Sequence, residues 1–104
     1  MVKNLFEDLP ASSAKEEAFL TLLESGNLRI ERIVSNGQAN PEGFWYDQEQ
    51  NEWVLLLKGT ASLKLHNGHV VDLKAGDYLL LEAHIKHRVE ATSADAIWLC
   101  VHYR

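Results

Sequence analysis

What the sequence lacks excludes several classes of protein. Its 104 residues include one cysteine, Cys100, so neither an intrachain disulfide nor a zinc site built on several cysteines can form. Lys and Arg are not clustered, and 15 acidic against 10 basic residues give a formal net charge of −5. We therefore expect no nucleic-acid or anionic-membrane partner, because both are bound through clustered positive charge. No apolar run approaches the roughly 20 residues that a membrane span needs.

The N-terminal segment, the single cysteine and the hydrophobic content favour one small domain in a reducing compartment. The chain begins MVKNLFEDLP, where Glu7 and Asp8 come too early for a secretory signal. Cys100 lies within the apolar run IWLCV, which is typical of a buried thiol. A hydrophobic content of 46% is enough for a packed core. We expect a single soluble domain in the cytoplasm.

Only the N-terminal part has a helical pattern. Ser13 and Glu16 have the spacing of a capping box, in which each side chain binds a free backbone amide of the other residue. An apolar stripe at helical spacing follows, and Gly26 is a plausible end. The stripe consists of Ala18, Phe19, Leu22 and Leu23. The pattern predicts a short helix over residues 14–24, within an N-terminal segment 1–27 that packs on the main fold.

From residue 28 onward, short apolar segments alternate with turn residues, which is typical of an antiparallel sandwich or barrel. Asn67-Gly68 is the strongest hairpin signal, because both positions of a tight turn need positive φ. The pattern predicts an all-β, antiparallel jelly-roll barrel over residues 28–104. The expected strands are 28–34, 52–59, 60–66, 69–73, 78–82, 87–91 and 96–103.

Two spacings within these strands resemble the motifs of the cupin family. Glu52 is followed after six residues by Gly59, as at the end of the first cupin motif. Gly76 and His87 have the spacing of the first glycine and the histidine of the second motif, with Glu82 at its proline position and His84 at its second glycine position. The chain therefore resembles a small single-domain cupin over about residues 28–103. That resemblance implies a double-stranded β-helix and, commonly, a homodimer.

The same resemblance implies a divalent metal, such as Mn, Fe, Zn or Ni, held inside the barrel. Glu52 and His87 occupy two ligand positions, whereas both histidines of the first motif are missing. The vacant positions hold Tyr46 and Gln48 in one alignment, or Trp45 and Asp47 in the other. A substitute set is available in which Gln48 or Asp47 joins Glu52 and His87, with His84 or His102 as a fourth ligand.

These residues also have purely structural interpretations. His87 paired with a carboxylate would be a satisfied polar residue of the core, and Glu52 could be a charge at a strand end. His84 lies in a turn, where exposure is the more common state. On the last strand His102 shares one face with Trp98 and Cys100, and the sequence does not decide which face is interior. Trp45, Tyr46 and His102 are candidates for a ligand pocket.

Three classes of function remain open, the last of which is a barrel that contributes a dimer surface within a larger assembly. The first is a non-catalytic module that binds a small molecule or a metal in its interior, which the loss of two imidazoles favours. The alternative is a mononuclear metal-dependent enzyme of dioxygenase or isomerase type that acts on a small organic molecule. The fold alone does not decide between them, because one architecture supports unrelated functions.

Overall fold

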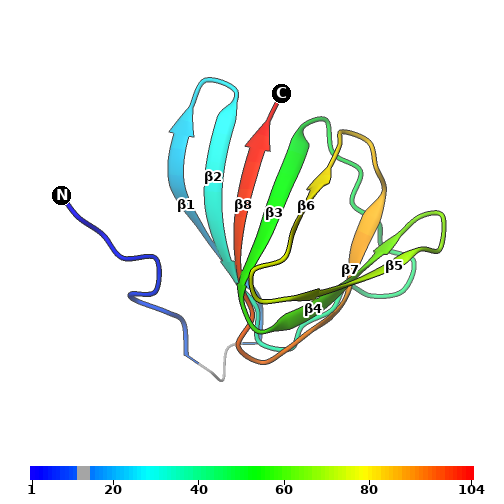
Figure 1. Cartoon of the computed structure of the whole chain (residues 1–104), viewed down its shortest axis with the longest axis horizontal. Coiled ribbons are helices and arrows are strands. Elements are labelled where there is room, and N and C mark those ends of the chain that lie inside the picture. The colour runs from blue at the N-terminus through cyan, green and yellow to red at the C-terminus, as the bar shows by residue number, and fades with distance from the viewer. Residues whose placement is uncertain (12–14) are drawn as a thin grey trace.

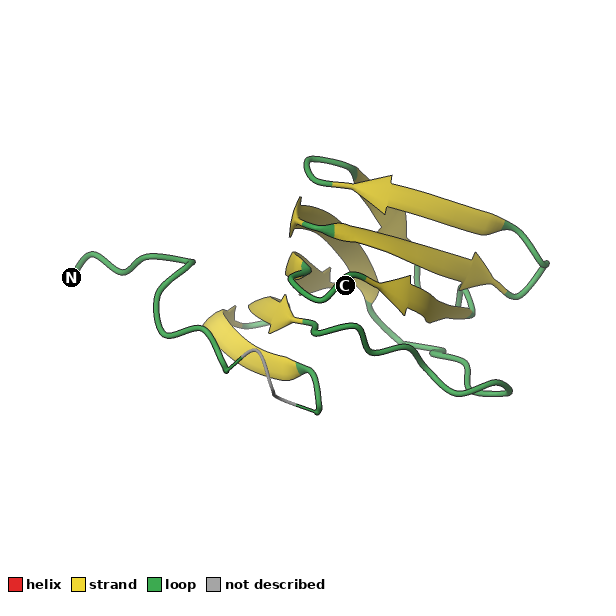
Figure 2. Ribbon diagram, turned by 90° about the horizontal axis from the view of Figure 1, so that it is seen from below, coloured by secondary structure: helices red, strands yellow, loops and turns green. Residues whose placement is uncertain are grey.

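The computed structural model describes residues 1–11 and 15–104, in which every regular element is a β-strand. Figure 2 correspondingly shows only strands and loops in this part of the chain, so no helix there could span a membrane. The strands are β1 (Ala18–Ser25), β2 (Leu28–Val34), β3 (Asn51–Lys58), β4 (Thr60–Leu65), β5 (Val70–Lys74), β6 (Tyr78–Leu81), β7 (His87–Thr92) and β8 (Ile97–Tyr103).

The strands form two antiparallel sheets. One has five strands in the order β1-β2-β8-β3-β6, which lie side by side in Figure 1, and the other has three in the order β5-β4-β7. This arrangement confirms the all-β, antiparallel prediction. The prediction of a barrel needs correction, because the described strands pair within two separate sheets and do not close into a ring. The space between the sheets remains accessible as a result.

All seven strands predicted from residue 28 onward are confirmed, with ends that differ by at most one residue. At the predicted hairpin, the Leu65 amide donates to the His69 carbonyl at 2.8 Å, and the Asn67 side chain accepts from the His69 amide. The hairpin is confirmed, but positive φ at both turn positions is not, because Gly68 has a φ of +91° whereas Asn67 is not in the left-handed region. Turn residues and alternation were nevertheless sufficient to locate these elements.

The helix predicted over residues 14–24 is wrong. Residues 18–25 form strand β1, which pairs with β2 through a turn at Gly26, where φ is +56°. Ser13 and Ala14 of the expected cap lie outside the described residues. An isolated helix of this length is marginal, whereas β1 gains a ladder of hydrogen bonds along β2. The domain boundary that we placed at residue 27 stays a prediction.

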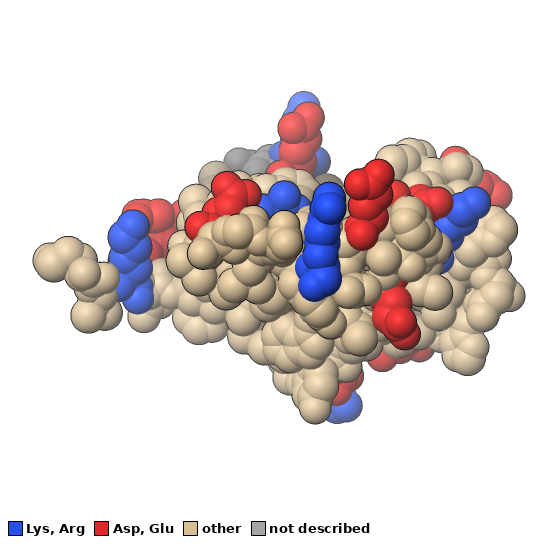
Figure 3. Space-filling model, turned by 90° about the horizontal axis from the view of Figure 1, so that it is seen from above, with Lys and Arg blue, Asp and Glu red and all other residues tan. Residues whose placement is uncertain are grey.

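The core lies between the two sheets. Its most buried side chains are Leu56, Cys100 and Ala96, and Trp98 is 4% exposed, with its indole N–H donating to Ser35 Oγ at 3.2 Å. On the outer face of β2, Arg32 donates from Nη1 to the carbonyls of two N-terminal residues at 2.9 Å each, and so fixes that segment. The face seen in Figure 3 carries single basic side chains among acidic ones, separated by wide areas of other residues.

Gly59, between β3 and β4, is required both by its backbone and by its surroundings. Its φ is +84°, and a Cβ there would collide with Ser93 Oγ and lie 3.0 Å from Ala96 Cα. The Ser93 hydroxyl cannot easily move, because it accepts from the Thr60 amide at 3.0 Å and donates to Asp95 at 2.8 Å. The last position of the first cupin motif therefore has a steric reason to be glycine.

We predict that Gly59→Ala lowers the free energy of unfolding by roughly 1–3 kcal/mol more than Gly76→Ala, the cost of overpacking a tight site. Gly76 is the matched control, since its φ is +95° and nothing lies within 4 Å of a Cβ there. Both variants incur the left-handed backbone penalty, so their difference isolates the collision. Chemical denaturation of both variants measures it, and equal losses would refute the steric argument.

Candidate functional site

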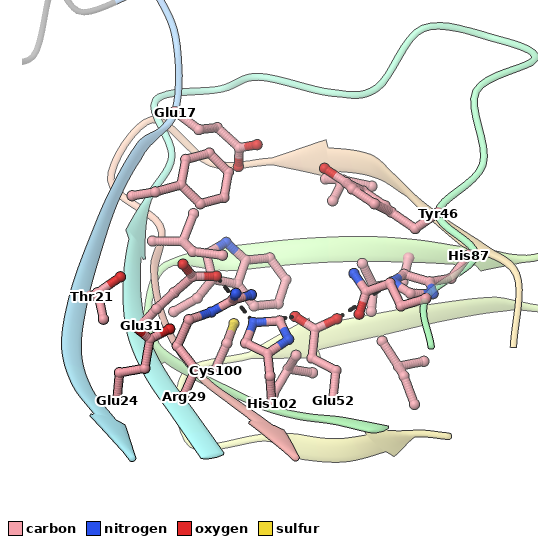
Figure 4. A pocket seen from close by; sticks show the side chains of 18 residues that line it. Glu17, Thr21, Glu24, Arg29, Glu31, Tyr46, Glu52, His87, Cys100 and His102 are labelled. Carbon is pink, nitrogen blue, oxygen red and sulfur yellow. Dashed lines mark hydrogen bonds and ion pairs between the residues drawn. The ribbon is translucent and has the colours of Figure 1, made fainter. Parts of the chain in front are cut away.

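A cavity of about 520 Å³ lies between the two sheets and receives side chains from both of them. This volume is within the range of sites for small organic molecules. Figure 4 shows its polar residues pointing inward from several strands and from the loop before β3. The polar and charged lining residues include Glu17, Thr21, Glu24, Arg29, Glu31, Tyr46, Gln48, Glu52, His87 and His102.

Strand register brings three of these residues into one row. Arg29 on β2 pairs with His102 on β8, and His102 pairs in turn with Glu52 on β3. Directly paired residues of antiparallel strands lie on the same face of the sheet, and all three line the cavity. The last strand therefore turns His102, Cys100 and Trp98 inward, which settles the choice that the sequence left open.

The other sheet contributes His87, at the start of β7. Its backbone bridges to Tyr46, whose amide donates to the His87 carbonyl at 2.7 Å, and the two rings stack with centroids 5.3 Å apart. Its side chain is 7% exposed, and Nδ1 lies 2.9 Å from the Ile85 carbonyl. A carbonyl can only accept, so Nδ1 carries the hydrogen and Nε2 faces the cavity.

Nε2 of His87 lies 3.6 Å from Oε1 of Glu52, whose side chain is 10% exposed. In a neutral ring, Nε2 would direct a lone pair at a carboxylate, which is repulsive. A cation between the two groups removes the repulsion, whether a proton on Nε2 or a metal ion. Burial lowers the pKa of His87, but the Glu52 carboxylate and the Ile85 carbonyl outweigh burial, so the pKa is raised above its ordinary value.

His102 extends this arrangement toward β2. Its Nε2 lies 3.1 Å from Oε1 of Glu31, within hydrogen-bonding distance, and 3.8 Å from Oε2 of Glu52. Glu31 and His102 are 9% and 4% exposed. Figure 4 shows the resulting chain of interactions, from Glu31 through His102 and Glu52 to His87. Two carboxylates and two imidazoles thus alternate across the cavity.

Two other ionisable groups of the cavity stay protonated near neutral pH. Burial raises the pKa of the Cys100 thiol well above its ordinary value, and the carboxylates of Glu52 and Glu31 add to this effect. Cys100 is therefore unsuited to act as a nucleophile. Burial likewise raises the pKa of Tyr46, although a hydrogen bond with Asn40 lowers it. The Tyr46 hydroxyl is available to donate a hydrogen bond.

The residues singled out from the sequence fall into two groups. Glu52, His87, Gln48, Tyr46 and His102 line the cavity. The remaining three lie elsewhere. His84 Nδ1 is 2.8 Å from Asp47 Oδ1 in an exposed pair, and the ring of Trp45 packs edge-on against His66. The ligand roles expected for Asp47 and His84, and the pocket role of Trp45, stay predictions.

His84 has a backbone conformation that matches its place in the motif. It occupies a glycine position of the second cupin motif, and its φ is +65°. Its amide donates to the Gln48 carbonyl at 2.8 Å, which ties this turn to the segment before β3. His84 thus adopts the left-handed conformation for which glycine is preferred.

Sequence reasoning missed Glu31 and Arg29. Both lie in the segment 28–34, which was correctly predicted as a strand, and alternation places them on one face together with Ile33. Two charged residues at this spacing beside an apolar one were the available signal. What could not be read from the sequence is that this face points inward, because that depends on pairing with β8.

A metal ion is implied by the cupin motifs, and the donor types fit one. Imidazole and carboxylate ligands suit Mn, Fe(II), Zn and Ni. His87 also has the outer-shell contact common to metal ligands, an Nδ1–H that donates to a backbone carbonyl. Among the described residues, however, no group of three or more His, Cys, Asp or Glu side chains is arranged to hold a metal ion. Binding would require rearrangement, above all of His102, whose Nε2 is engaged by Glu31.

Comparison with known proteins identifies the family. The model of the cupin domain matches residues 33–102. The chain belongs to the cupin family. A candidate mannose-6-phosphate isomerase from Ralstonia eutropha JMP134, known from its crystal structure, is 43% identical, with 99% of this chain and 97% of that chain covered and a TM-score of 0.93. No curated protein matches.

More distant cupins share the fold. A cupin superfamily protein from Desulfitobacterium hafniense DCB-2 is 19% identical, with a TM-score of 0.75 and coverage of 99% of this chain and 97% of that chain. An RmlC-like cupin from Shewanella frigidimarina NCIMB 400 is 16% identical, with a TM-score of 0.71 and coverage of 84% and 75%. At these identities the likeness concerns the fold alone.

We predict that Glu52→Gln lowers the pKa of His87 in metal-free protein, because it removes the carboxylate that stabilises the protonated ring. The pKa of His87 is higher in the folded state than in the unfolded state, where it is about 6.5. The pair therefore stabilises the fold fully below the unfolded-state pKa. This contribution is lost as pH rises through the folded-state pKa. The difference in free energy of unfolding between wild type and Glu52→Gln should therefore decrease as pH rises from below about 6.5 to above the folded-state pKa of His87.

Imidazole NMR titration of chelator-treated protein measures the pKa, and denaturation at several pH values measures the stability. Asp47→Asn is the matched control, because it removes a carboxylate that lies outside the cavity, in the exposed pair with His84. An unchanged pKa of His87 in Glu52→Gln would show that the two groups are not coupled.

Proposed function

We propose that this cupin binds a small hydroxy-carbonyl compound in its cavity and isomerises it by proton transfer. The observation that supports this most is the position of Glu52, whose two carboxylate oxygens face the Nε2 atoms of His87 and His102 at 3.6 and 3.8 Å. Buried acid–base pairs that open into a cavity are typical of catalytic sites. The 43% identical protein from Ralstonia eutropha, a candidate mannose-6-phosphate isomerase, points to the same class of reaction.

The chemistry assigns a distinct role to each group. The Glu52 carboxylate accepts the proton from the carbon next to the substrate carbonyl, and the electron pair of that C–H bond forms the double bond of an enediol. Protonated His87 donates to the carbonyl oxygen, and its raised pKa keeps it charged at a higher pH than an ordinary histidine. Glu52 then returns the proton to the former carbonyl carbon, while the hydroxyl on the adjacent carbon gives its proton to the now neutral His87 and becomes the new carbonyl, so both groups regain their starting states. Such acid–base groups contribute about 10²–10⁴-fold in rate.

We predict that the wild-type protein incorporates deuterium from D₂O at the carbon next to the carbonyl of an aldose phosphate. Mannose 6-phosphate and the free sugar are the first substrates to test, with NMR as the readout. Glu52→Gln and His87→Gln should each lower the exchange rate by about 10²-fold or more. His84→Gln is the control, since that ring is exposed and outside the cavity. Undiminished exchange in Glu52→Gln would contradict the mechanism, and ligand binding without exchange would favour the binding module.

A divalent metal at the same place is a second candidate. Four carboxylates line the cavity, against the single guanidinium of Arg29, so the site has an excess of negative charge that a divalent cation would balance. Glu52 and His87 would hold it, with His102 as a third ligand after release from Glu31. A bound metal would stabilise negative charge on the substrate oxygen.

The metal proposal predicts close to one Mn, Fe, Zn or Ni ion per chain in untagged protein from metal-supplemented culture. Glu52→Gln and His87→Ala should each empty the site without unfolding the chain, because each removes one ligand. His84→Ala should leave the metal content unchanged. Elemental analysis and thermal unfolding provide the two readouts. Equal metal content in wild type and both cavity variants would refute the site.

A homodimer and a cytoplasmic location complete the proposal. The acidic net charge argues against nucleic-acid and membrane partners, so a small molecule is the ligand class that we propose. For the dimer, the edge strand β1 offers a surface, since Leu20, Leu22 and Leu23 are 46%, 43% and 51% exposed. A second copy seated against this strand would bury them and satisfy its free backbone edge.

A further inference from the structure

Among the residues that the structure describes, Arg29 is the only lysine or arginine that lines the cavity. It lies on β2 between Glu24 of β1 and His102 of β8, directly opposite each of them. Figure 4 shows its side chain reaching inward from β2. A guanidinium held within a cavity of small-molecule size is a ready recognition group for an anion.

The guanidinium of Arg29 differs from two others that share one feature with it. Arg29, Arg32 and Arg88 each have a buried Nε without a hydrogen-bond partner in the described chain. Arg32 nevertheless donates from Nη1 to the Leu5 and Glu7 carbonyls. Arg88 donates from Nη2 to the Asn40 carbonyl, and its Nε, although not hydrogen-bonded, forms an ion pair with Oε2 of Glu90 at 3.1 Å. The guanidinium groups of both of these arginines are therefore engaged in contacts within the fold.

Arg29 has no such partner within the described part of the chain. Glu24 lies opposite it and Glu31 follows on the same face, yet none of the ion pairs among the described residues includes Arg29. Glu31 instead accepts from His102. The Nε–H and the adjacent Nη of Arg29 thus form an unused fork, whose geometry matches two oxygens of a phosphate or carboxylate.

Arg29 is also suitably placed relative to the acid–base residues. It is separated from Glu52 by one strand, β8, so their backbones are about 10 Å apart at the usual strand spacing. A molecule of a few carbon atoms can span this distance with its carbonyl near Glu52 and an anionic group at its far end. The register of β2, β8 and β3 sets this separation.

We propose that Arg29 recognises an oxyanion on the ligand, so that the substrate class is a small hydroxy-carbonyl compound with a terminal phosphate or carboxylate. This inference rests on the proposed function for the identity of the reacting part, but the anion site itself can be tested without turnover. Its defining property is paired hydrogen bonding by the fork, which lysine cannot reproduce.

The test measures binding of inorganic phosphate and, separately, acetate to wild type, Arg29→Lys and Arg29→Gln. NMR of the arginine Nε–H groups reports on contact, and calorimetry gives the dissociation constants. Arg104→Gln is the matched control, since it removes the same charge at an exposed site where the guanidinium lies 3.8 Å from Glu49. Thermal unfolding verifies that each variant is folded.

We expect phosphate or acetate to shift the Arg29 Nε–H signal, and both Arg29 variants to bind that anion at least about tenfold more weakly, the loss expected for a hydrogen bond to a charged group. The anion that binds more tightly identifies the substrate group. If Arg29→Gln does not fold, Arg29→Lys alone decides. Anion binding by the Arg29 variants equal to that of wild type, or an unshifted Nε–H signal at saturating phosphate and acetate, would overturn the proposal.

Glu52→Gln separates this proposal from the proposed function. It should retain phosphate binding while it loses deuterium exchange. Retained exchange in that variant would refute the acid–base mechanism and leave the role of Arg29 intact, whereas loss of anion binding in Arg29→Gln alone supports Arg29 whatever the reaction is.

Discussion

The arrangement of the two sheets depends on the contacts that surround one buried carboxylate, that of Glu52. Glu52 lies between two imidazoles inside the protein, where an uncompensated charge is costly. Its partners come from different parts of the fold: His102 is set opposite it by the pairing of β3 with β8, whereas His87 approaches from the second sheet. Both imidazoles stay opposite the carboxylate only while the sheets keep their strand registers. The cluster therefore constrains the relative position of the two sheets.

Such a cluster is a poor device for stability alone. Replacing buried ion pairs by apolar residues of similar size is often neutral or stabilising, so their presence calls for another explanation. Here the four groups border a cavity instead of filling a closed core, and the imidazole nitrogen of His87 that faces the cavity is the one left free by Ile85. An arrangement that fixes one tautomer and leaves the other nitrogen facing a ligand site is suited to proton transfer or metal binding.

Most of the fold could be predicted because its signals are local. Seven strands from residue 28 onward alternate with turns at residues that favour them, such as Gly68, whose φ is +91°. The first strand was missed because its apolar residues satisfy helical spacing as well as they satisfy a strand. Phe19 and Leu23 are 58% and 51% exposed, so no buried face imposes alternation on this edge strand. The open arrangement of the sheets depends on long-range pairing, which no local pattern specifies.

The residues of the site also differ in whether a local sequence pattern could identify them. Glu52 and His87 could be found because they belong to motifs with fixed spacing, whereas Glu31 and Arg29 enter the cavity only through the register of β2 against β8. A slip of one residue in that register would turn both side chains to the outer face and bring Ile30 inward. The charges that Glu31 and Arg29 bring to the cavity are therefore determined by strand pairing rather than by the cupin motifs.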